Sequence, residues 1–314
     1  MNAISPAAPY PRVSVVIPTC NRPEDVRRCL DHMARVSYPH WDLVVVDQSD
    51  DERTEAVARR FMDALPNLTY HRMREKGAAR ARNGGIAITE GEIIAFIDDD
   101  CTVAPNWLDE VAATLQRHPQ VSLIFGAVES APHNPRESYV TVYTPRKESV
   151  AHGPRSFLHT QGLSANMYMR REVVARVGLF DTCLGPGSGV FTGGGEDIDY
   201  LYRSLARGLH VVYTPHVAVK HYGMRDYGSG AVGRLFRNYA YCSGAADMKL
   251  LRCGHVAAIV MIAVHALYCL TRINLPNLIS RRGMSNLEWI SMYTRGLFAS
   301  FRLGVDRRHS LYVR

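Results

Sequence analysis

The stretch EIIAFIDDDC, residues 92–101, joins an almost wholly apolar run to three consecutive aspartates. A short apolar run of this kind fits a strand that is buried on both faces of a sheet. Adjacent carboxylates repel one another, so three of them after a buried strand must either lie in water or face a cation. A calcium-binding EF-hand is excluded because Val103 occupies the sixth loop position, which requires glycine. A solvated turn at the end of the strand is the alternative to a ligand site.

The first 128 residues alternate between short apolar runs and amphipathic helical patterns. Helices are expected from about Pro23, with Asn21 as N-cap, at 57–65 and from about Pro105. Strand, helix and strand in repeated order predict an α/β fold with a mainly parallel sheet covered by helices on both faces. Strands are expected at 13–18, 43–46, 68–71, 92–97 and 121–128.

Two of the aspartates directly follow predicted strands, Asp47 after LVVV and Asp98 after IIAFI. In open α/β sheets, ligands bind beyond the carboxyl ends of the strands. Both aspartates are therefore expected at the ligand-binding edge. A divalent cation with oxygen ligands would neutralise the triplet and also hold a diphosphate.

A second acidic motif, GGGEDIDY at 193–200, opens a predicted helix after an irregular polar excursion at 129–160. Helix capping alone explains Glu196 and Asp197, because the helix dipole favours anions in the first turn. Beside a metal–carboxylate site, one of these two acids becomes a candidate general base. Asp199 lies four residues before Arg203, which predicts a surface ion pair.

Histidine and arginine side chains supply further candidates. His221 could complete the coordination of an ion such as Mn²⁺, although a histidine after a strand is more often structural. Arg80 and Arg82 could contact phosphate, or lie on an ordinary basic helix face. The glycines of EKGAARARNGGI, residues 75–86, do not make a GxGxxG fingerprint, and the sequence contains no P-loop, so phosphates are expected to be held by a metal and arginines.

The basic character of the chain belongs to its C-terminal region. Residues 221–314 hold 13 Lys/Arg and 4 Asp/Glu, a net charge of +9, whereas the whole chain is +7. Residues 253–271 carry no formal charge, and we expect a buried or interfacial helix there rather than a membrane span. Either an anionic membrane surface or a dimerisation layer would suit this region. The seven cysteines form no CxxC pair and no secretion signal is seen, so reduced thiols in the cytoplasm are expected.

Five motifs in order carry a family resemblance: VSVVIPTCNRPEDVRRCL, VVVDQSDD, GAARARNGGIAITEGEIIAFIDDD, ANMYMRREVVARVGLFD and GGGEDIDYLYRSLARGLHVVYTPHVAVKHYG. Together they resemble family 2 glycosyltransferases with a GT-A fold. The resemblance implies an inverting enzyme that moves a sugar from a nucleotide-diphosphate sugar, with Mg²⁺ or Mn²⁺ as cofactor. UDP-sugars are used by many members.

The resemblance also implies roles for individual residues. Asp197 would be the catalytic base, with Glu196 assisting it or holding the acceptor. VDQSDD departs from the frequent VDNGSxD, which leaves the role of Asp50 open. Among the donor-binding residues, Asp47 would contact the base and Asp98 the ribose. The full set expected to bind the donor is Pro18, Thr19, Asn21, Arg22, Asp47, Arg82, Asp98 and Asp99. The expected metal ligands are Asp100, Asp98 and His221.

The expected organisation is an N-terminal tail (1–12), a nucleotide-sugar-binding half (13–128), an acceptor-binding and catalytic half of the same domain (129–230) and a basic, apolar helical region (231–314). The acceptor would be a glycan or a lipid-linked molecule, at the inner face of the plasma membrane. A homodimer through the C-terminal region is a further possibility, and no nucleic-acid partner is expected. A nucleotidyltransferase and an inactive sugar- or membrane-binding protein are the alternative functions.

Overall fold

The computed structural model describes residues 10–159, 161–271 and 284–314. Its centre is a nine-stranded sheet in the order β3-β2-β1-β4-β9-β6-β10-β5, with β8 paired to β10. The five strands expected in the first 128 residues all belong to it. The strands are β1 (Val13–Thr19), β2 (Trp41–Asp47), β3 (Leu68–Arg72), β4 (Ile93–Ile97), β5 (Cys101–Val103), β6 (Val121–Ser130), β8 (Ser149–His152), β9 (Asn166–Arg170) and β10 (His210–His221).

Strand direction gathers the functional candidates at one edge of this sheet. β1, β2, β3 and β4 run parallel to one another, and β6 runs parallel to β10. β9 lies between β4 and β6 and is antiparallel to both, so β4 and β6 point the same way. The carboxyl ends of β1, β2, β4 and β10 therefore meet at a single edge, and the expectation of a mainly parallel α/β sheet is confirmed.

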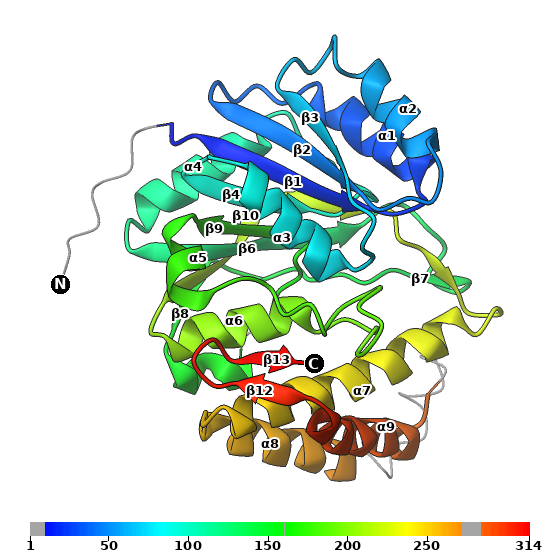
Figure 1. Ribbon diagram of the computed structural model, residues 1–314, viewed down its shortest axis with the longest axis vertical. Helices are drawn as coiled ribbons and strands as arrows, with labels where there is room; N and C mark the ends of the chain where they lie inside the picture. Colours follow the sequence, from blue (N-terminus) through cyan, green and yellow to red (C-terminus); the bar gives the residue numbers. More distant parts are fainter. Residues whose placement is uncertain (1–9, 160, 272–283) are drawn as a thin grey trace.

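Helices cover both faces of the sheet (Figure 1). Val15 and Ile17 pack with residues of α1 (Pro23–Met33) and α4 (Trp107–Arg117), whereas Val16 packs with those of α3 (Ala78–Ile88), α5 (Glu172–Val177) and α6 (Glu196–Ala206). Successive side chains of a strand point to opposite faces, so one apolar run supplies both cores. This explains why the strands read as nearly continuous apolar segments.

Two helix boundaries differ from the sequence expectation. Asn21 does not cap α1: its φ is +58°, and its side-chain amide exchanges two hydrogen bonds with Asp50. Arg22 occupies the N-cap position without a side-chain capping bond. The next helix, α2 (Arg53–Arg60), ends before Phe61, which caps it.

The irregular excursion after β6 contributes a strand to the edge of the central sheet. It forms β7 (Ser138–Tyr139), which pairs with β11 (Arg225–Asp226), then β8, which extends the sheet, and the 3-10 helix η1 (Pro154–His159). The two apolar runs HVVYTP and VAVKHYG belong to one strand, β10. A register shift between Thr214 and Ala218 interrupts its pairing with β6, which explains why the sequence reads as two segments.

The C-terminal region forms a helical layer beneath the sheet domain (Figure 1). It contains α7 (Ala231–Arg252), α8 (Ala257–Thr271) and α9 (Asn286–Ala299), then η3 (Ser300–Arg302) and a hairpin of β12 (Gly304–Asp306) and β13 (Leu311–Val313). Gly244 and Gly296 allow α7 and α9 to approach closely, because a Cβ on either would lie about 2 Å from the facing backbone. Among the described residues, no helix has both the length and the apolar character needed to cross a bilayer.

A buried ionic network ties this layer to the sheet domain. Lys249 of α7 is fully buried, with its Nζ 2.7 Å from Asp181 and 2.6 Å from Asp199 of α6. Asp199 also pairs with Arg203 at 2.9 Å. The expected pair therefore forms, but the prediction that it lies on the surface is wrong, since both side chains are fully buried. Burial acts to raise the pKa of Asp181, but the Lys249 ammonium holds that pKa below its usual value.

Replacing Lys249 by methionine should leave Asp181 and Asp199 buried without their shared cation. Breaking a buried ion pair by removing one partner costs about 3–5 kcal/mol. We expect a loss of that size in the free energy of unfolding of Lys249→Met, measured by urea titration. Arg234→Met, an exposed site on the same helix, is the matched control and should change stability by less than about 0.5 kcal/mol. Equal losses in the two variants would contradict the role of the network.

Candidate active site

The aspartate triplet forms the turn between β4 and β5, at the carboxyl edge of the sheet. β5 pairs antiparallel with the end of β10, with Cys101 opposite His221. This register brings Asp100 beside His221, and Asp100 Oδ1 lies 3.2 Å from His221 Nε2. The backbone N–H of Tyr222 also donates to the carbonyl of Asp100 at 2.8 Å. Two residues more than a hundred positions apart thus meet because two strand ends are paired.

The tautomer of His221 is fixed by a backbone contact. Its Nδ1 lies 2.9 Å from the carbonyl oxygen of Thr141, which can only accept, so Nδ1 carries a proton. In the neutral ring Nε2 then presents a lone pair to Asp100 Oδ1, and two acceptors that face each other need a proton or a metal ion between them. Burial acts to lower the pKa of His221, but its hydrogen bond with Asp100 raises that pKa overall.

This pair fits a divalent cation. Ligand atoms of Asp100, Cys101 and His221 lie within 4.8 Å of one another. Burial raises the pKa of the Cys101 thiol well above its usual value, so it stays protonated and is a poor ligand. A Cβ at Gly223 would lie 2.5 Å from His221 Nε2, so glycine leaves this side of the pair open. Carboxylate and imidazole together suit Mn²⁺.

Asp99 is buried and connects two loops. Its Oδ2 accepts a hydrogen bond from the Thr19 hydroxyl at 2.7 Å, and its Oδ1 accepts one from Arg22 at 3.1 Å. Arg22 also donates to Asp100 at 3.2 Å and therefore lies between the two carboxylates. Burial raises the pKa of Asp99 to about 7, although Arg22 opposes this shift. The loop after β1 is thereby held against the aspartate turn.

Arg82 of α3 joins this turn to the second acidic motif. Its guanidinium donates to Asp98 and to Glu196, each at 2.9 Å, and the arginine is only 3% exposed. Asp98 is thus bonded to Arg82, and its role as a metal ligand stays a prediction. Arg82 was expected near the donor nucleotide; the described structure places it between two acids from distant parts of the chain.

Glu196 and Asp197 open α6, as expected, but their surroundings differ. Glu196 is buried and held by Arg82, whereas Asp197 is half-buried and accepts only backbone N–H groups of Ser164 and Ile198. Burial raises the pKa of Glu196 to about 7, with a further contribution from the Asp197 charge. Burial also raises the pKa of Asp197, against the effect of Arg82. Together the pair can bind a proton near neutral pH.

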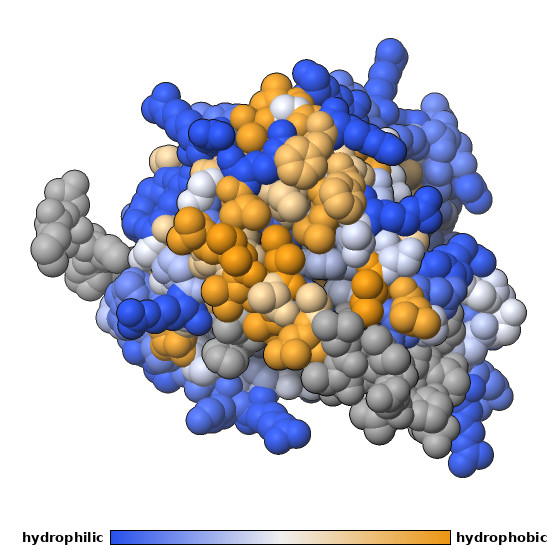
Figure 2. All heavy atoms as spheres, turned by 90° about the horizontal axis from the view of Figure 1, so that it is seen from below, coloured by the Kyte–Doolittle hydropathy of each residue, from blue (hydrophilic) through white to orange (hydrophobic). Residues whose placement is uncertain are grey.

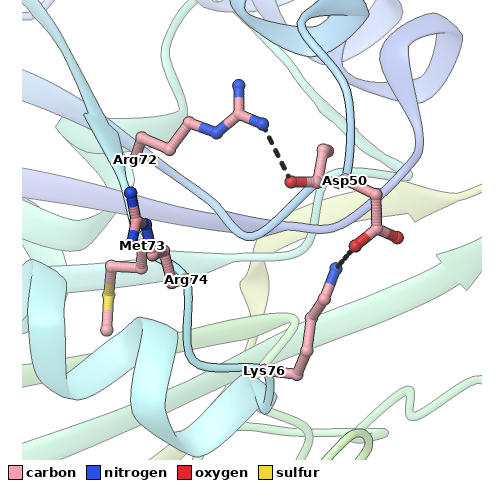
Figure 3. A pocket seen from close by; sticks show the side chains of 6 residues that line it. Asp50, Arg72, Met73, Arg74 and Lys76 are labelled. Carbon is pink, nitrogen blue, oxygen red and sulfur yellow. Dashed lines mark hydrogen bonds and ion pairs between the residues drawn. The ribbon is translucent and has the colours of Figure 1, made fainter.

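A cleft of about 590 Å³ opens beyond the carboxyl ends of β2 and β3 (Figure 3). Its lining is strongly polar, and Lys76 Nζ lies 2.7 Å from the exposed carboxylate of Asp50 across it. Arg72 donates to the carbonyl of Ser49 at 3.2 Å. The lining residues are Ser49, Asp50, Arg72, Met73, Arg74 and Lys76.

Asp47, expected at the nucleotide base, lies beneath this cleft. It is fully buried, and its two oxygens accept from the Ser49 backbone at 2.8 Å and from the Tyr70 hydroxyl at 2.7 Å. Its contact with a base stays a prediction, and the exposed carboxylate above it is Asp50. Pro18, Thr19, Asn21 and Arg22 lie in or directly after the end of β1, at the same edge.

Sequence reasoning missed several groups at this edge. Three basic side chains come from the end of β3 and the segment after it, namely Arg72, Arg74 and Lys76. They alternate along the sequence, but the sequence did not indicate which residues they would contact. Thr141 contributes only a backbone carbonyl, and backbone groups leave no signal in the residue type. The link from Arg22 to Asp99 and Asp100 joins residues more than 75 positions apart, and spacing along the chain could not indicate it.

Comparison with known proteins identifies relatives. A family model described as glycosyl transferase family 2 matches residues 14–178, just over half of the chain. The Glycosyltransferase AglE of Haloferax volcanii is 33% identical over 187 residues, which cover 57% of this chain and 59% of that relative. The matched stretch thus spans less than two thirds of the relative's length.

Solved structures resemble this fold at low sequence identity. The mannosyltransferase PcManGT from Pyrobaculum calidifontis, in complex with GDP-Man and Mn²⁺, superposes with a TM-score of 0.58 at 20% identity, over 95% of this chain and 88% of that chain. S. aureus TarS 1–349 in complex with UDP-GlcNAc gives 0.57 at 15% identity, over 91% and 81%. At these identities the likeness shows the GT-A fold.

The Arg82 bridge makes a pH-dependent contribution to stability. At pH 8 Glu196 is ionised, because its folded pKa is about 7, so Arg82→Met should lower the free energy of unfolding by about 3–5 kcal/mol. At pH 5.5 Glu196 holds its proton, because its folded pKa is about 7, and the loss should be smaller. Urea unfolding at the two pH values measures this difference.

Arg59→Met is the control for that comparison. Arg59 forms an exposed (i, i+4) pair with Glu55, which contributes little to stability at either pH. A loss for Arg82→Met that is the same at pH 5.5 and pH 8 would mean that the bridge is not electrostatic.

Proposed function

Because the chain belongs to glycosyl transferase family 2, we propose that it transfers a sugar from a nucleotide-diphosphate sugar to an acceptor hydroxyl with inversion at the anomeric carbon. The observation that carries this proposal is the arrangement of two acidic groups on one sheet edge. Asp100 and His221 form one group, and Glu196 and Asp197 at the start of α6 form the other. Arg82 joins the two through Asp98 and Glu196.

We propose that the donor nucleotide lies across the loop after β1 and the cleft beyond β2 and β3. Thr19, Asn21 and Arg22 line the first loop, and Arg22 supplies a guanidinium at the diphosphate. In the cleft, Asp50 and Lys76 offer an acceptor and a donor to the edge of a base. Asp47 supports this surface from below through Ser49 and Tyr70. Asp98 would contact the ribose while it stays bonded to Arg82.

Asp100 and His221 would hold the divalent cation, Mg²⁺ or Mn²⁺. When bound there, the ion stabilises negative charge on the departing diphosphate. The hydrogen bond from His221 Nδ1 to Thr141 orients the ring toward the ion. Arg22, which lies 3.2 Å from Asp100, adds a second positive charge on the same side.

Asp197 is the proposed general base and removes a proton from the attacking hydroxyl of the acceptor. It is more accessible than Glu196, and among the described residues its carboxylate accepts hydrogen bonds from backbone N–H groups and from no cationic side chain. Burial keeps the pKa of this base raised, although Arg82 opposes the shift. A base with a pKa close to the working pH is the most effective in proton transfer.

Two rival functions make different products. A nucleotidyltransferase would form a sugar nucleotide and release pyrophosphate, and it would give the Glu196–Asp197 pair no evident purpose. An inactive binding protein would release nothing. With Mn²⁺ present, release of nucleoside diphosphate from a panel of nucleotide sugars supports sugar transfer, and no release indicates an inactive protein. Pyrophosphate release from a nucleoside triphosphate and a sugar phosphate would overturn the proposal.

The acceptor is proposed to be a glycan or a lipid-linked molecule used in surface polysaccharide or glycolipid synthesis. A C-terminal region with a net charge of +9 suits attachment to the anionic inner face of the plasma membrane. We retain the division of the chain at residues 128 and 230 into donor, acceptor and C-terminal parts as part of this proposal.

Asp197→Asn should lower kcat about 10²- to 10⁴-fold, the usual contribution of a general base, with little change in donor affinity. In the wild type, activity should rise with pH through about 7 as the acid pair loses its proton, and the variant should lack this rise. Steady-state kinetics and calorimetric titration of the donor measure the two effects. Asp51→Asn, an exposed carboxylate paired with Arg53, is the control. Unchanged turnover in Asp197→Asn would remove Asp197 from this role.

His221→Ala should raise the Mn²⁺ concentration required for half-maximal activity by at least about tenfold, since a ligand of the ion is lost. Chelation with EDTA should abolish wild-type turnover, and added Mn²⁺ should restore it. His152→Ala, which removes an exposed histidine of β8, should leave the metal requirement unchanged. Full activity of the EDTA-treated protein would contradict a metal-dependent reaction.

A further inference from the structure

One side of α8 is exposed and wholly apolar. Its large side chains are between 41% and 60% exposed, and Val256, directly before the helix, is 73% exposed. The helix contains no charged residue. At 100° per residue they span roughly 140° of the helix circumference, which is a broad face rather than scattered positions. Figure 2 shows apolar side chains gathered on the lower face of the molecule, where α8 lies, with hydrophilic ones around them. The α8 face consists of Val256, Ile259, Val260, Val264 and Leu267.

The opposite side of α8 holds the helix in place. Ala258 and Met261 are buried in the core shared with α6 and α7. His265 lies 3.0 Å from the buried carboxylate of Asp247 on α7, and it packs against Trp289 and Tyr293 of α9. The α8 face is therefore presented by a fixed helix. A helix that is apolar on all sides is typical of a buried or lipid-contacting element, and this one is buried on one side only.

Positive charge lies at the N-terminal end of the α8 face. The turn of the β12–β13 hairpin is held there by a 2.9 Å contact between His255 and Ser310. That turn carries Arg307 and Arg308, both exposed. Its acid, Asp306, lies 2.6 Å from His309. Among the described residues, the hairpin turn thus adds exposed arginines beside exposed apolar side chains.

The arginines beside the apolar face help to distinguish between two partners for it, a second copy of the chain and a lipid bilayer. In a symmetric dimer the same patch meets itself. The α8 segment of the second copy carries no acidic side chain that could pair with Arg307 and Arg308. An anionic bilayer instead offers an apolar interior to the α8 face and phosphate groups to Arg307 and Arg308. The charges therefore favour a lipid surface over a second copy of the chain.

We infer that the α8 face is the surface through which the protein docks on an anionic phospholipid bilayer, with α8 parallel to the membrane plane. The inference rests on the proposed membrane attachment and specifies the contacting residues. α7 packs against α8 and also carries Lys249, which is bonded to Asp199 of α6. The docked helix is thus connected by a buried ion pair to the helix that bears Glu196 and Asp197. An acceptor anchored in the same bilayer would meet the site from a fixed side.

Flotation of the full chain with vesicles tests the docking surface. The wild type should float with vesicles that contain phosphatidylglycerol and much less with pure phosphatidylcholine. Val260→Glu and Leu267→Glu together should reduce the bound fraction at least about tenfold, because two carboxylates would enter the apolar layer. Arg307→Ala with Arg308→Ala should weaken binding by about tenfold or more and reduce its dependence on salt. Ile88→Glu, an exposed apolar position on α3, is the matched control and should float like the wild type.

Two further measurements separate a failure of membrane docking from misfolding and from a failure of the proposed reaction. Thermal unfolding of each variant shows that it is folded, and donor hydrolysis in solution should be equal in wild type and Val260→Glu/Leu267→Glu. If the wild type does not hydrolyse the donor, the proposed reaction is wrong, but the docking surface is unaffected. Failure of the wild type to float, or flotation that survives the α8 substitutions, would overturn the docking surface. A concentration-dependent dimer that the α8 substitutions disperse would assign the face to a second copy instead.

Discussion

Repulsion between carboxylates at one edge of the sheet is the constraint on which the rest of the site depends. Several acids converge there in partly buried surroundings, where like charges interact strongly. Each close group of acids is accompanied by a cation from a distant part of the chain. Arg22 lies between Asp99 and Asp100, and Arg82 lies between Asp98 and Glu196. The loop after β1, which carries Arg22, and helix α3, which carries Arg82, are thereby held against the acids.

The same repulsion gives the acids different properties. Asp100 Oδ1 faces His221 Nε2, and either a proton or a metal ion can lie between these two atoms. Burial raises the pKa values of Glu196 and Asp197, which suits the proton transfer proposed for this pair. Carboxylates at one edge thus differ in their proposed roles, metal binding for Asp100 and base catalysis for Asp197. Their surroundings, rather than their residue types, make the distinction.

Buried charge also joins the C-terminal layer to the sheet domain. Lys249 is the centre of this connection, since it contacts Asp181 in the segment before α6 and Asp199 within α6. The close crossing of α7 and α9 at Gly244 and Gly296 makes the layer compact beneath it. The apolar α8 face and the acid pair therefore belong to one continuous packed structure. A change at the lower surface can be expected to act on the orientation of the whole site, because no loose linker separates them in the described residues.

The sequence by itself determined the five strands of the first 128 residues, the helices between them and the positions of both acidic motifs, because apolar periodicity and strand-end acids are local properties. It predicted functional roles for Asp98–Asp100 and for the Glu196–Asp197 pair without any structure. Only the tertiary structure decided their partners. The antiparallel pairing of β5 with β10 brought Asp100 to His221, and the packing of α3 carried Arg82 to Glu196. It also showed that Asp47 lies below the cleft and that the Asp199–Arg203 pair is buried. Burial and long-range contact arise from how elements pack, and residue spacing along the chain does not encode them.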